Sequence, residues 1–157
     1  MNTVILLLVL AALLGSGMMA GVFFVFSVSV MAALARIPPP EGIRAMQSIN
    51  RTILNPLFLG SFTGTALVSA TLVVLGILGH LGNGTAWFSA ASLFYLLGTV
   101  TVTAVANVPM NDKLDTMNPE TGDRYWQFYL RKWTRLNHFR TVCALGACAL
   151  FAIGLIQ

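Results

Sequence analysis

The sequence predicts an all-α polytopic membrane protein, a four-helix transmembrane bundle in which residues 1–157 form a single integral domain. All 14 Asp, Glu, Lys and Arg side chains fall within residues 36–51 and 112–140. The remaining stretches of 35, 60 and 17 uncharged residues are long enough for one, two and one crossings, because about 20 apolar residues span a bilayer. The 57% hydrophobic content and the mean hydropathy of +0.80 exclude an ordinary soluble surface.

The four spans are expected at roughly residues 4–34, 56–78, 86–108 and 138–156. The first should end at Pro38–Pro40, because proline supplies no backbone donor. Residues 41–55 alternate polar and apolar side chains at helical spacing, which predicts an amphipathic segment before span 2. The glycine-rich residues 79–84 form a turn between spans 2 and 3. A turn-rich segment over 109–124 should lead into a helical extension, starting near Asp123, before span 4.

Two glycines in the second span, Gly60 and Gly64, are four residues apart and lie beside Ser61 and Thr65. Small residues at this spacing let helix backbones approach closely. We therefore expect both glycines to face another helix of the bundle.

The positive charges predict how the chain is oriented in the membrane. Arg36, Arg44 and Arg51 lie in the first connection and six more Lys and Arg residues lie in or beside the third, whereas the second connection and both termini have none. The positive-inside rule then places both termini on the non-cytoplasmic side of a plasma or inner membrane. The net charge of +4 is explained by this orientation signal, so the lipid bilayer is the expected surrounding and nucleic acid is not an expected partner. A homo-oligomer is compatible with the sequence.

A stripe of polar and aromatic side chains marks the start of span 4. The spacings of 3, 4, 4 and 3 place on one helix face Trp126, Tyr129, Trp133, Asn137 and Arg140. Trp and Tyr at this position are also typical of an interfacial belt. Asn137 and Arg140 are different, because unpaired polar groups in an apolar span are costly and should therefore face the bundle.

Other polar residues gather at the same ends of the spans. Asn107 and Asn111 close span 3, and Asn50 precedes span 2. Helix capping explains one or two such asparagines readily and the whole set less well. His138, one residue off the stripe, is either a hydrogen-bonded structural group or a general base. No metal site is expected, because His80 and His138 lie on opposite sides of the membrane and no Cys/His cluster exists.

Four segments follow one another along the chain: residues 30–34 (VMAAL), residues 46–51 (MQSINR) with Asn55-Pro56, residues 107–111 (NVPMN), and Trp133 followed by residues 137–141 (NHFRT). In order and spacing they resemble the anthrone-oxygenase family of small membrane proteins over nearly the whole chain. One departure is Ala32, where similar sequences often carry proline.

The resemblance implies a monooxygenase that uses dioxygen to oxidise an apolar aromatic of the anthrone type. An anthrone that loses a proton becomes a delocalised carbanion, which can itself reduce dioxygen. The protein then needs to supply only a base, donors for the enolate oxygen and a dry pocket. No cofactor is predicted for such a reaction, and haem or copper, with His138 as a ligand, is left open.

Site roles follow from the same resemblance. His138 is the expected base, and the oxyanion is expected to contact Asn107, Asn137 and Arg140. The substrate rings are expected to stack on Trp126, Tyr129 and Trp133, with Asn50 and Asn111 as further contacts.

A competing hypothesis is a small membrane protein without enzymatic activity, which binds an apolar ligand or the helices of a partner. The polar cluster would then be a structural hydrogen-bond network. The two hypotheses differ in packing: an enzyme needs a cavity reaching His138 and Arg140, whereas a structural network should be packed solid.

Overall fold

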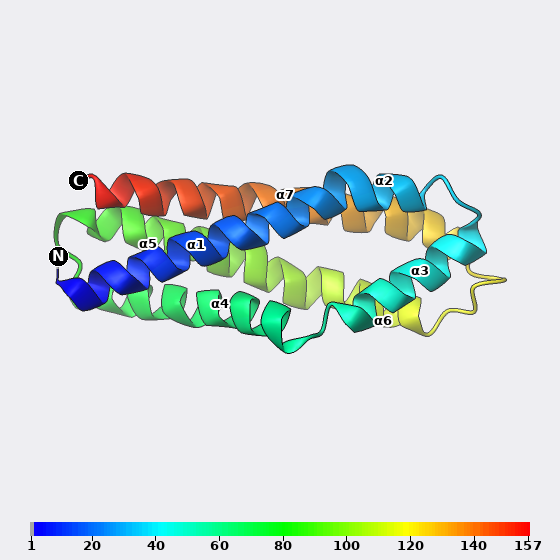
Figure 1. The fold of residues 1–157 in the computed structure, drawn as a ribbon, viewed down its shortest axis with the longest axis horizontal. Helices are drawn as coiled ribbons and strands as arrows, with labels where there is room; N and C mark the ends of the chain where they lie inside the picture. Colours follow the sequence, from blue (N-terminus) through cyan, green and yellow to red (C-terminus); the bar gives the residue numbers. More distant parts are fainter. Residues whose placement is uncertain (1) are drawn as a thin grey trace.

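The computed structural model describes residues 2–157 as an antiparallel bundle of four long helices (Figure 1). Each is long and apolar enough to cross a membrane, and they cover Thr3–Leu34, Pro56–Ile77, Gly82–Asp115 and Asp123–Leu155. The chain is therefore an all-α, multi-pass integral membrane protein, as the charge distribution predicted. Both termini lie at one end of the bundle, and the first and third connections, which carry the charged residues, lie at the other. We call this second end the charged end.

The first span is continuous but not uniform. It comprises α1 (Thr3–Val25), the π-helical segment η1 (Phe26–Val30) and α2 (Met31–Leu34). At its start the side-chain oxygen of Asn2 accepts a hydrogen bond from the Ile5 amide at 2.9 Å. The span ends before the proline run, as expected, and Pro39 becomes the first residue of the next helix, where its missing N–H costs nothing.

Helix α3 (Pro39–Thr52) is the amphipathic segment that the sequence predicted, and it caps the charged end. Its buried face includes Ile43, Met46 and Asn50. Gln47 holds it in place by donating from Nε2 to the carbonyls of Leu114 and Met117, at 2.9 and 3.0 Å. Two ion pairs, Arg44 with Glu120 and Arg51 with Asp115, add surface contacts to the third connection. Helix α3 is thereby fixed to the opposite side of the charged end.

The third span extends further than predicted. After the short turn η2 (Gly82–Gly84), it runs through α5 (Thr85–Leu93), two π-helical segments, η3 (Phe94–Thr101) and η4 (Thr103–Asn107), and α6 (Val108–Asp115). The helix therefore passes Pro109, where the sequence predicted that a loop begins. Proline normally breaks a helix because it lacks an N–H and clashes with the preceding turn. Here the wider π-helical turns come directly before α6, so Pro109 occupies the first turn of a new α-helical segment.

The second and fourth spans are regular helices. Helix α4 (Pro56–Ile77) begins at Asn55, whose side-chain oxygen accepts from the Phe58 amide at 3.0 Å. Helix α7 (Asp123–Leu155) starts at Asp123, which confirms the predicted helical extension before span 4. The two parts of α7 pack in different regions of the molecule. Its C-terminal part packs within the membrane-spanning bundle, and its N-terminal part supports the charged end.

The molecule has two apolar cores rather than one. The core of the spanning bundle includes Val9, Met19, Leu72, Phe88 and Phe151. A second core, at the charged end, joins α2, α3, α6 and the first half of α7, and consists of Met31, Leu34, Ile43, Met46, Leu114, Trp126, Tyr129 and Trp133. The second core makes the charged end a packed structure rather than a set of loops.

The expectation that Gly60 and Gly64 face another helix is wrong. A Cβ atom added to either glycine would meet nothing within 4 Å. Close helix contacts occur elsewhere, because an added Cβ at Gly15 would collide with the Thr65 side chain, and one at Gly98 with Cys143. Small residues four apart suit close helix packing in general, but these two lie on the outward face of α4, together with the exposed Leu57 and Leu67.

Alanine substitutions separate the two kinds of glycine. Gly15→Ala should lower stability in mild detergent by about 1–3 kcal/mol, because the methyl group overlaps Thr65 across the contact between α1 and α4. Gly60→Ala, the matched control, should leave the thermal midpoint unchanged or slightly higher, because alanine favours the helix. Melting followed by size-exclusion chromatography measures both, and equal losses would contradict this packing.

Candidate functional site

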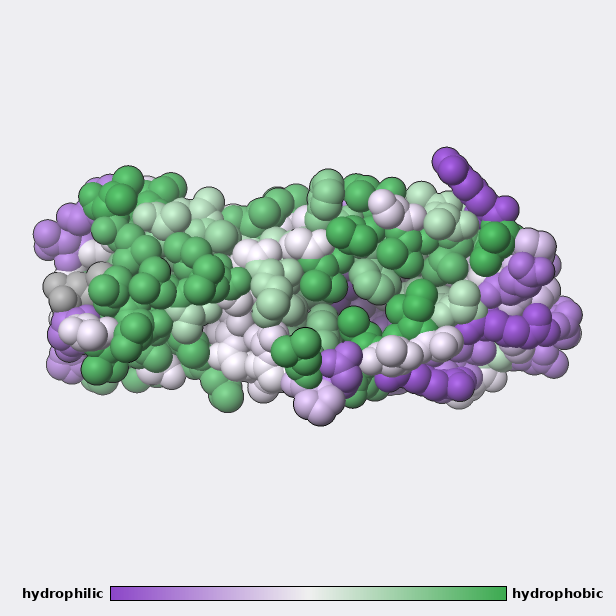
Figure 2. All heavy atoms as spheres, viewed as in Figure 1, coloured by the Kyte–Doolittle hydropathy of each residue, from purple (hydrophilic) through white to green (hydrophobic). Residues whose placement is uncertain are grey.

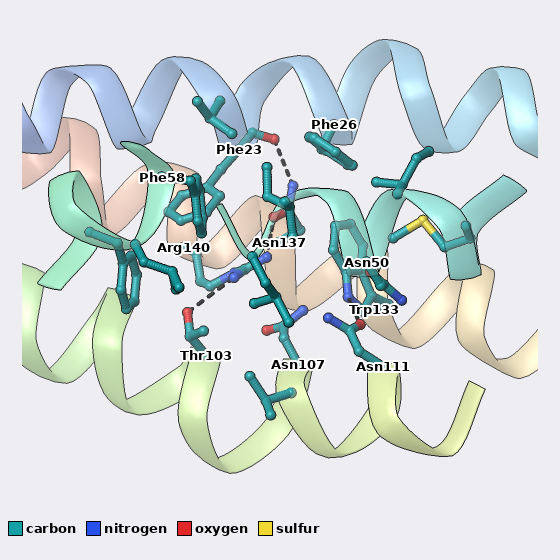
Figure 3. Close-up of a pocket in the computed structure, with 18 of the residues that line it drawn as sticks. Phe23, Phe26, Asn50, Phe58, Thr103, Asn107, Asn111, Trp133, Asn137 and Arg140 are labelled. Atoms are coloured by element: carbon teal, nitrogen blue, oxygen red, sulfur yellow. Dashed lines mark hydrogen bonds between the residues drawn. The ribbon is translucent and has the colours of Figure 1, made fainter. Parts of the chain in front are cut away.

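A cavity of about 250 Å³ lies among α1, α3, α4, η4 and α7, on the inner side of the charged end (Figure 3). Most of its wall is apolar, with rings and aliphatic chains from Phe23, Phe26, Ile49, Phe58, Phe62 and others. Polar side chains gather on one part of the wall, and they are Asn50, Thr63, Thr103, Asn107, Asn111, Asn137 and Arg140. Such a wall suits a small apolar molecule that carries a few polar atoms.

Among residues 2–157, Arg140 is the only charged residue in the cavity wall, and the residue is only 5% exposed. Its guanidinium donates to the Thr103 hydroxyl at 3.0 Å and to the side-chain oxygen of Asn137. It also lies over the Phe23 ring, 4.3 Å from the centroid. Among residues 2–157, the carboxylates found in ion pairs bind Arg44 and Arg51 instead. The positive charge of Arg140 is therefore held by neutral groups.

Asn137 holds the arginine in position from its own helix, three residues earlier. Its amide nitrogen donates to the Phe23 carbonyl at 2.6 Å and to the Ser27 hydroxyl at 2.7 Å, while its oxygen accepts from Arg140. The carbonyl of Phe23 and the hydroxyl of Ser27 belong to the first span, where η1 changes the helical repeat. Asn137 thus ties α7 to the first span and fixes the direction of the guanidinium.

Three stacked aromatic rings support the other side of the cavity. Trp126, Tyr129 and Trp133 follow one another along α7 with ring centroids 5.7 and 6.0 Å apart. Tyr129 and Trp133 both donate to the side-chain oxygen of Asn111, at 2.7 and 2.8 Å. The side-chain oxygen of Asn111 therefore faces the rings, and its amide nitrogen points away from them.

Several polar atoms in the cavity wall have no hydrogen-bond partner within the described chain. They are both side-chain atoms of Asn107, the amide nitrogen of Asn50 and Nε of Arg140. Asn107 is 1% exposed, and a buried amide with neither donor nor acceptor satisfied is costly. The π-helical segment η4 ends at this residue and places it in the wall. The wall is therefore prepared for a molecule that can both donate and accept hydrogen bonds, or for water.

Comparison with known families places residues 55–150 within the family described as anthrone oxygenase. The chain belongs to the anthrone oxygenase family. The match covers α4, the whole third span and most of α7, and so includes the cavity residues Thr103, Asn107, Asn111, Asn137 and Arg140. It does not extend to residues 30–34 and 46–51, which the resemblance above also included. Searches of curated proteins and of solved structures found no match.

The structure brings together most of the site residues expected of an anthrone oxygenase family member. Those that line the cavity are Asn50, Asn107, Asn111, Trp133, Asn137 and Arg140. Trp126 and Tyr129 do not line it, because they are packed into the second core, where they are 1% and 0% exposed. Of the three rings expected to stack on a ligand, only Trp133 reaches the cavity.

His138 is also outside the cavity. Its side chain is exposed on the outer face of α7, since one residue along a helix turns the side chain by about 100° from the buried Asn137. The cavity expected to reach both His138 and Arg140 reaches Arg140 alone. This position removes the geometric basis for His138 as the base. Within residues 2–157, no three His, Cys, Asp or Glu side chains lie close enough together to bind a metal ion.

Sequence reasoning missed Phe23, Ser27 and Thr103, which hold Asn137 and Arg140. Each looked like an ordinary residue of an apolar span. The available signal was weak: Ser27 and Thr103 are hydroxyl residues within otherwise apolar helices. Their role depends on how the first, third and fourth spans pack against one another. Only that packing brings them to the Arg140 guanidinium and the Asn137 amide.

Asn111→Ala should destabilise the charged end, because it leaves the Tyr129 hydroxyl and the Trp133 indole without their acceptor. Each unsatisfied donor costs about 1–3 kcal/mol, so the thermal midpoint should fall clearly. Asn83→Ala, in the exposed turn at the opposite end, is the control and should melt like the parent protein. Tryptophan fluorescence should shift in the first variant only. Identical melting of both variants would show that the Asn111 contacts contribute nothing.

Proposed function

We propose that this protein is a membrane-embedded oxygenase that converts an anthrone-type aromatic into a quinone with dioxygen. The observation that carries the proposal is a buried guanidinium, without a carboxylate partner, in the wall of an otherwise apolar cavity. A cation held by neutral groups favours a ligand that develops negative charge. Membership of the anthrone oxygenase family supports the same chemistry. The positive-inside rule puts the cavity toward the cytoplasmic face.

The wall of the cavity suits both parts of such a substrate. Flat apolar rings would contact Phe26, Phe58 and Trp133, and burial of their surface would favour binding. The substrate oxygen would lie toward Arg140 and the unsatisfied amide of Asn107. Donors aimed at the place where charge develops stabilise an enolate without needing to reorganise during the reaction.

The proposed reaction takes one anthrone and one dioxygen to one anthraquinone and one water. The methylene carbon loses a proton, and its electron pair spreads onto the carbonyl oxygen as an enolate. The enolate transfers an electron to dioxygen, and the resulting radicals join at that carbon. The peroxide formed takes up a proton and then loses water, which breaks the O–O bond and the remaining C–H bond and leaves a carbonyl. Dioxygen is the only oxidant needed.

Removal of the first proton does not call for a protein base in the cavity wall. Within the described residues 2–157, the polar groups of the wall are amides, hydroxyls, an indole and a guanidinium, and they include no His, Asp or Glu. A nearby positive charge favours the ionised form of a ligand and so lowers the pKa of a bound anthrone. Water held beside the unsatisfied polar atoms of the cavity wall can then accept the proton. Arg140 favours this transfer by stabilising the enolate and does not itself act as the base.

The lack of a wall base also favours a second candidate, a protein that binds an apolar aromatic without oxidising it. The two functions share the cavity and differ in whether oxygen is consumed. Binding of an anthrone by the purified protein without oxygen uptake would support this alternative.

Oxygen uptake with an anthrone substrate, in mild detergent, tests the proposed function. Arg140→Met should lower the rate by about 10²–10³-fold, the usual scale for loss of an oxyanion-stabilising group. Arg135→Met and His138→Ala, both at exposed positions on the same helix, are the controls and should stay close to wild type. The absorption spectrum of the same preparation reveals any bound haem or copper. No uptake by the wild-type protein would refute the oxygenase assignment for this substrate class.

A further inference from the structure

The cavity has an opening on the side of the bundle, between α1 and the junction of α3 and α4. Figure 2 shows a hollow at this place, bordered mostly by hydrophobic residues and with hydrophilic colour at its floor. Two leucines that line the cavity lie at the surface, with Leu54 63% exposed and Leu59 41% exposed. We propose that the ligand reaches the cavity through this opening from the hydrocarbon of the bilayer, and not from water. The inference rests on the proposed function only for the identity of the ligand.

The side opening borders the lipid-facing surface of the first turns of α4. Gly60 and Gly64 have open space where a side chain would be, and they share the outward helix face with the exposed Leu57. The opposite face packs inward, where Phe58 and Phe62 contact the core of the spanning bundle. The helical structure is also interrupted between Ile53 and Pro56, so α3 and α4 are not one continuous helix. The cavity lies beside this interruption, where the exposed Leu54 and Leu59 line it.

The outward face of the first turns of α4 is suited to contact with lipid. Its outward side chains are apolar, as Leu57 at 81% exposure shows, and the helix is one of the four membrane-spanning segments. Two of its hydroxyl groups are satisfied within the helix, because Ser61 donates to the Leu57 carbonyl at 2.8 Å and Thr65 to the Ser61 carbonyl at 2.7 Å. The hydroxyl residue between them, Thr63, belongs to the cavity wall. Ser61 and Thr65 therefore do not need water where α4 faces hydrocarbon.

On the aqueous side of the charged end, helix α3 separates the site cavity from the surface. A shallow outer cavity of about 230 Å³, lined by Ser48, Thr52 and Asn55, shares only Ile49 and Ile53 with the site cavity. These two side chains form the wall between the cavities. Helix α3, which carries them, is fixed by the two Gln47 hydrogen bonds and by the Arg51–Asp115 ion pair at 2.8 Å. A route from water would have to move this fixed helix.

The chemistry of the ligand favours the same direction. A flat aromatic ketone concentrates in hydrocarbon because removal of its apolar surface from water is favourable. From the opening, the wall changes from leucine and phenylalanine to Asn107 and Arg140 at the floor. An incoming molecule would therefore lead with its oxygen and leave its rings toward the lipid.

Rates of ligand transfer distinguish the two routes, and 9,10-anthraquinone is a suitable probe because it cannot be oxidised further. The probe is delivered from donor vesicles to full-length protein in lipid nanodiscs, and binding is followed by quenching of tryptophan fluorescence, since Trp133 lines the cavity. The Leu54→Phe/Leu59→Phe variant narrows the lipid opening. Thr52→Phe fills the outer, water-side cavity, and Leu57→Phe is the matched control on the lipid-facing side of α4.

We expect association and dissociation in the Leu54→Phe/Leu59→Phe variant to slow together by about tenfold, as added rings must be displaced from the opening. Thr52→Phe and Leu57→Phe should bind like wild type. Slowing by Thr52→Phe alone, unchanged rates in the double variant, or no binding of the probe by wild type would each overturn the inference. Binding with these rates but no oxygen uptake with an anthrone would refute the proposed function and leave the inference intact.

Discussion

The burial of the Arg140 guanidinium without a carboxylate is the constraint on which the site depends. A charge at this depth must be paired, hydrated or held by dipoles and rings, because its isolated burial is very costly. Thr103, Asn137 and the Phe23 ring supply those contacts from three different spans. The first, third and fourth helices are therefore brought together around one side chain, and its charge stays uncompensated toward the cavity.

The rest of the charged end serves to hold these contacts in place. The stacked rings of α7 form a rigid support through the second core, and Asn111 connects that support to the third span. Helix α3 closes the aqueous side and is attached to the third connection by Gln47. The π-helical segments η1 and η4 change the helical repeat at the level of the cavity and so bring Phe26 and Asn107 into its wall. Helix α4 completes the cavity wall with Phe58, Leu59 and Phe62.

The sequence predicted the architecture well because the bilayer imposes strong and local rules. Charge-free length defined the spans, the proline run ended the first, and polar side chains in an apolar helix pointed to Asn137 and Arg140. Properties that depend on how the helices pack against one another could not be predicted from the sequence by such local rules. The spacing of Gly60 and Gly64 suited close packing, but only their position on the outward face of α4 shows that they are open. The exposed His138 and the buried Asn137 are neighbours on α7, and the rotation of the helix by one residue separates them. The continuation of the third span past Pro109 depends on π-helical turns that carry no clear sequence signal.

The ionisation of a bound hydroxyanthraquinone tests the central claim, that Arg140 stabilises an oxyanion in the cavity, most directly. The absorption band of 1,8-dihydroxyanthraquinone shifts when a hydroxyl ionises, so titration gives the ligand pKa in the protein and in empty detergent micelles. An uncompensated cation should lower that pKa by about one unit or more in the wild-type protein, and Arg140→Met should abolish the difference. A ligand pKa in the wild-type protein equal to or above that in micelles would contradict the account.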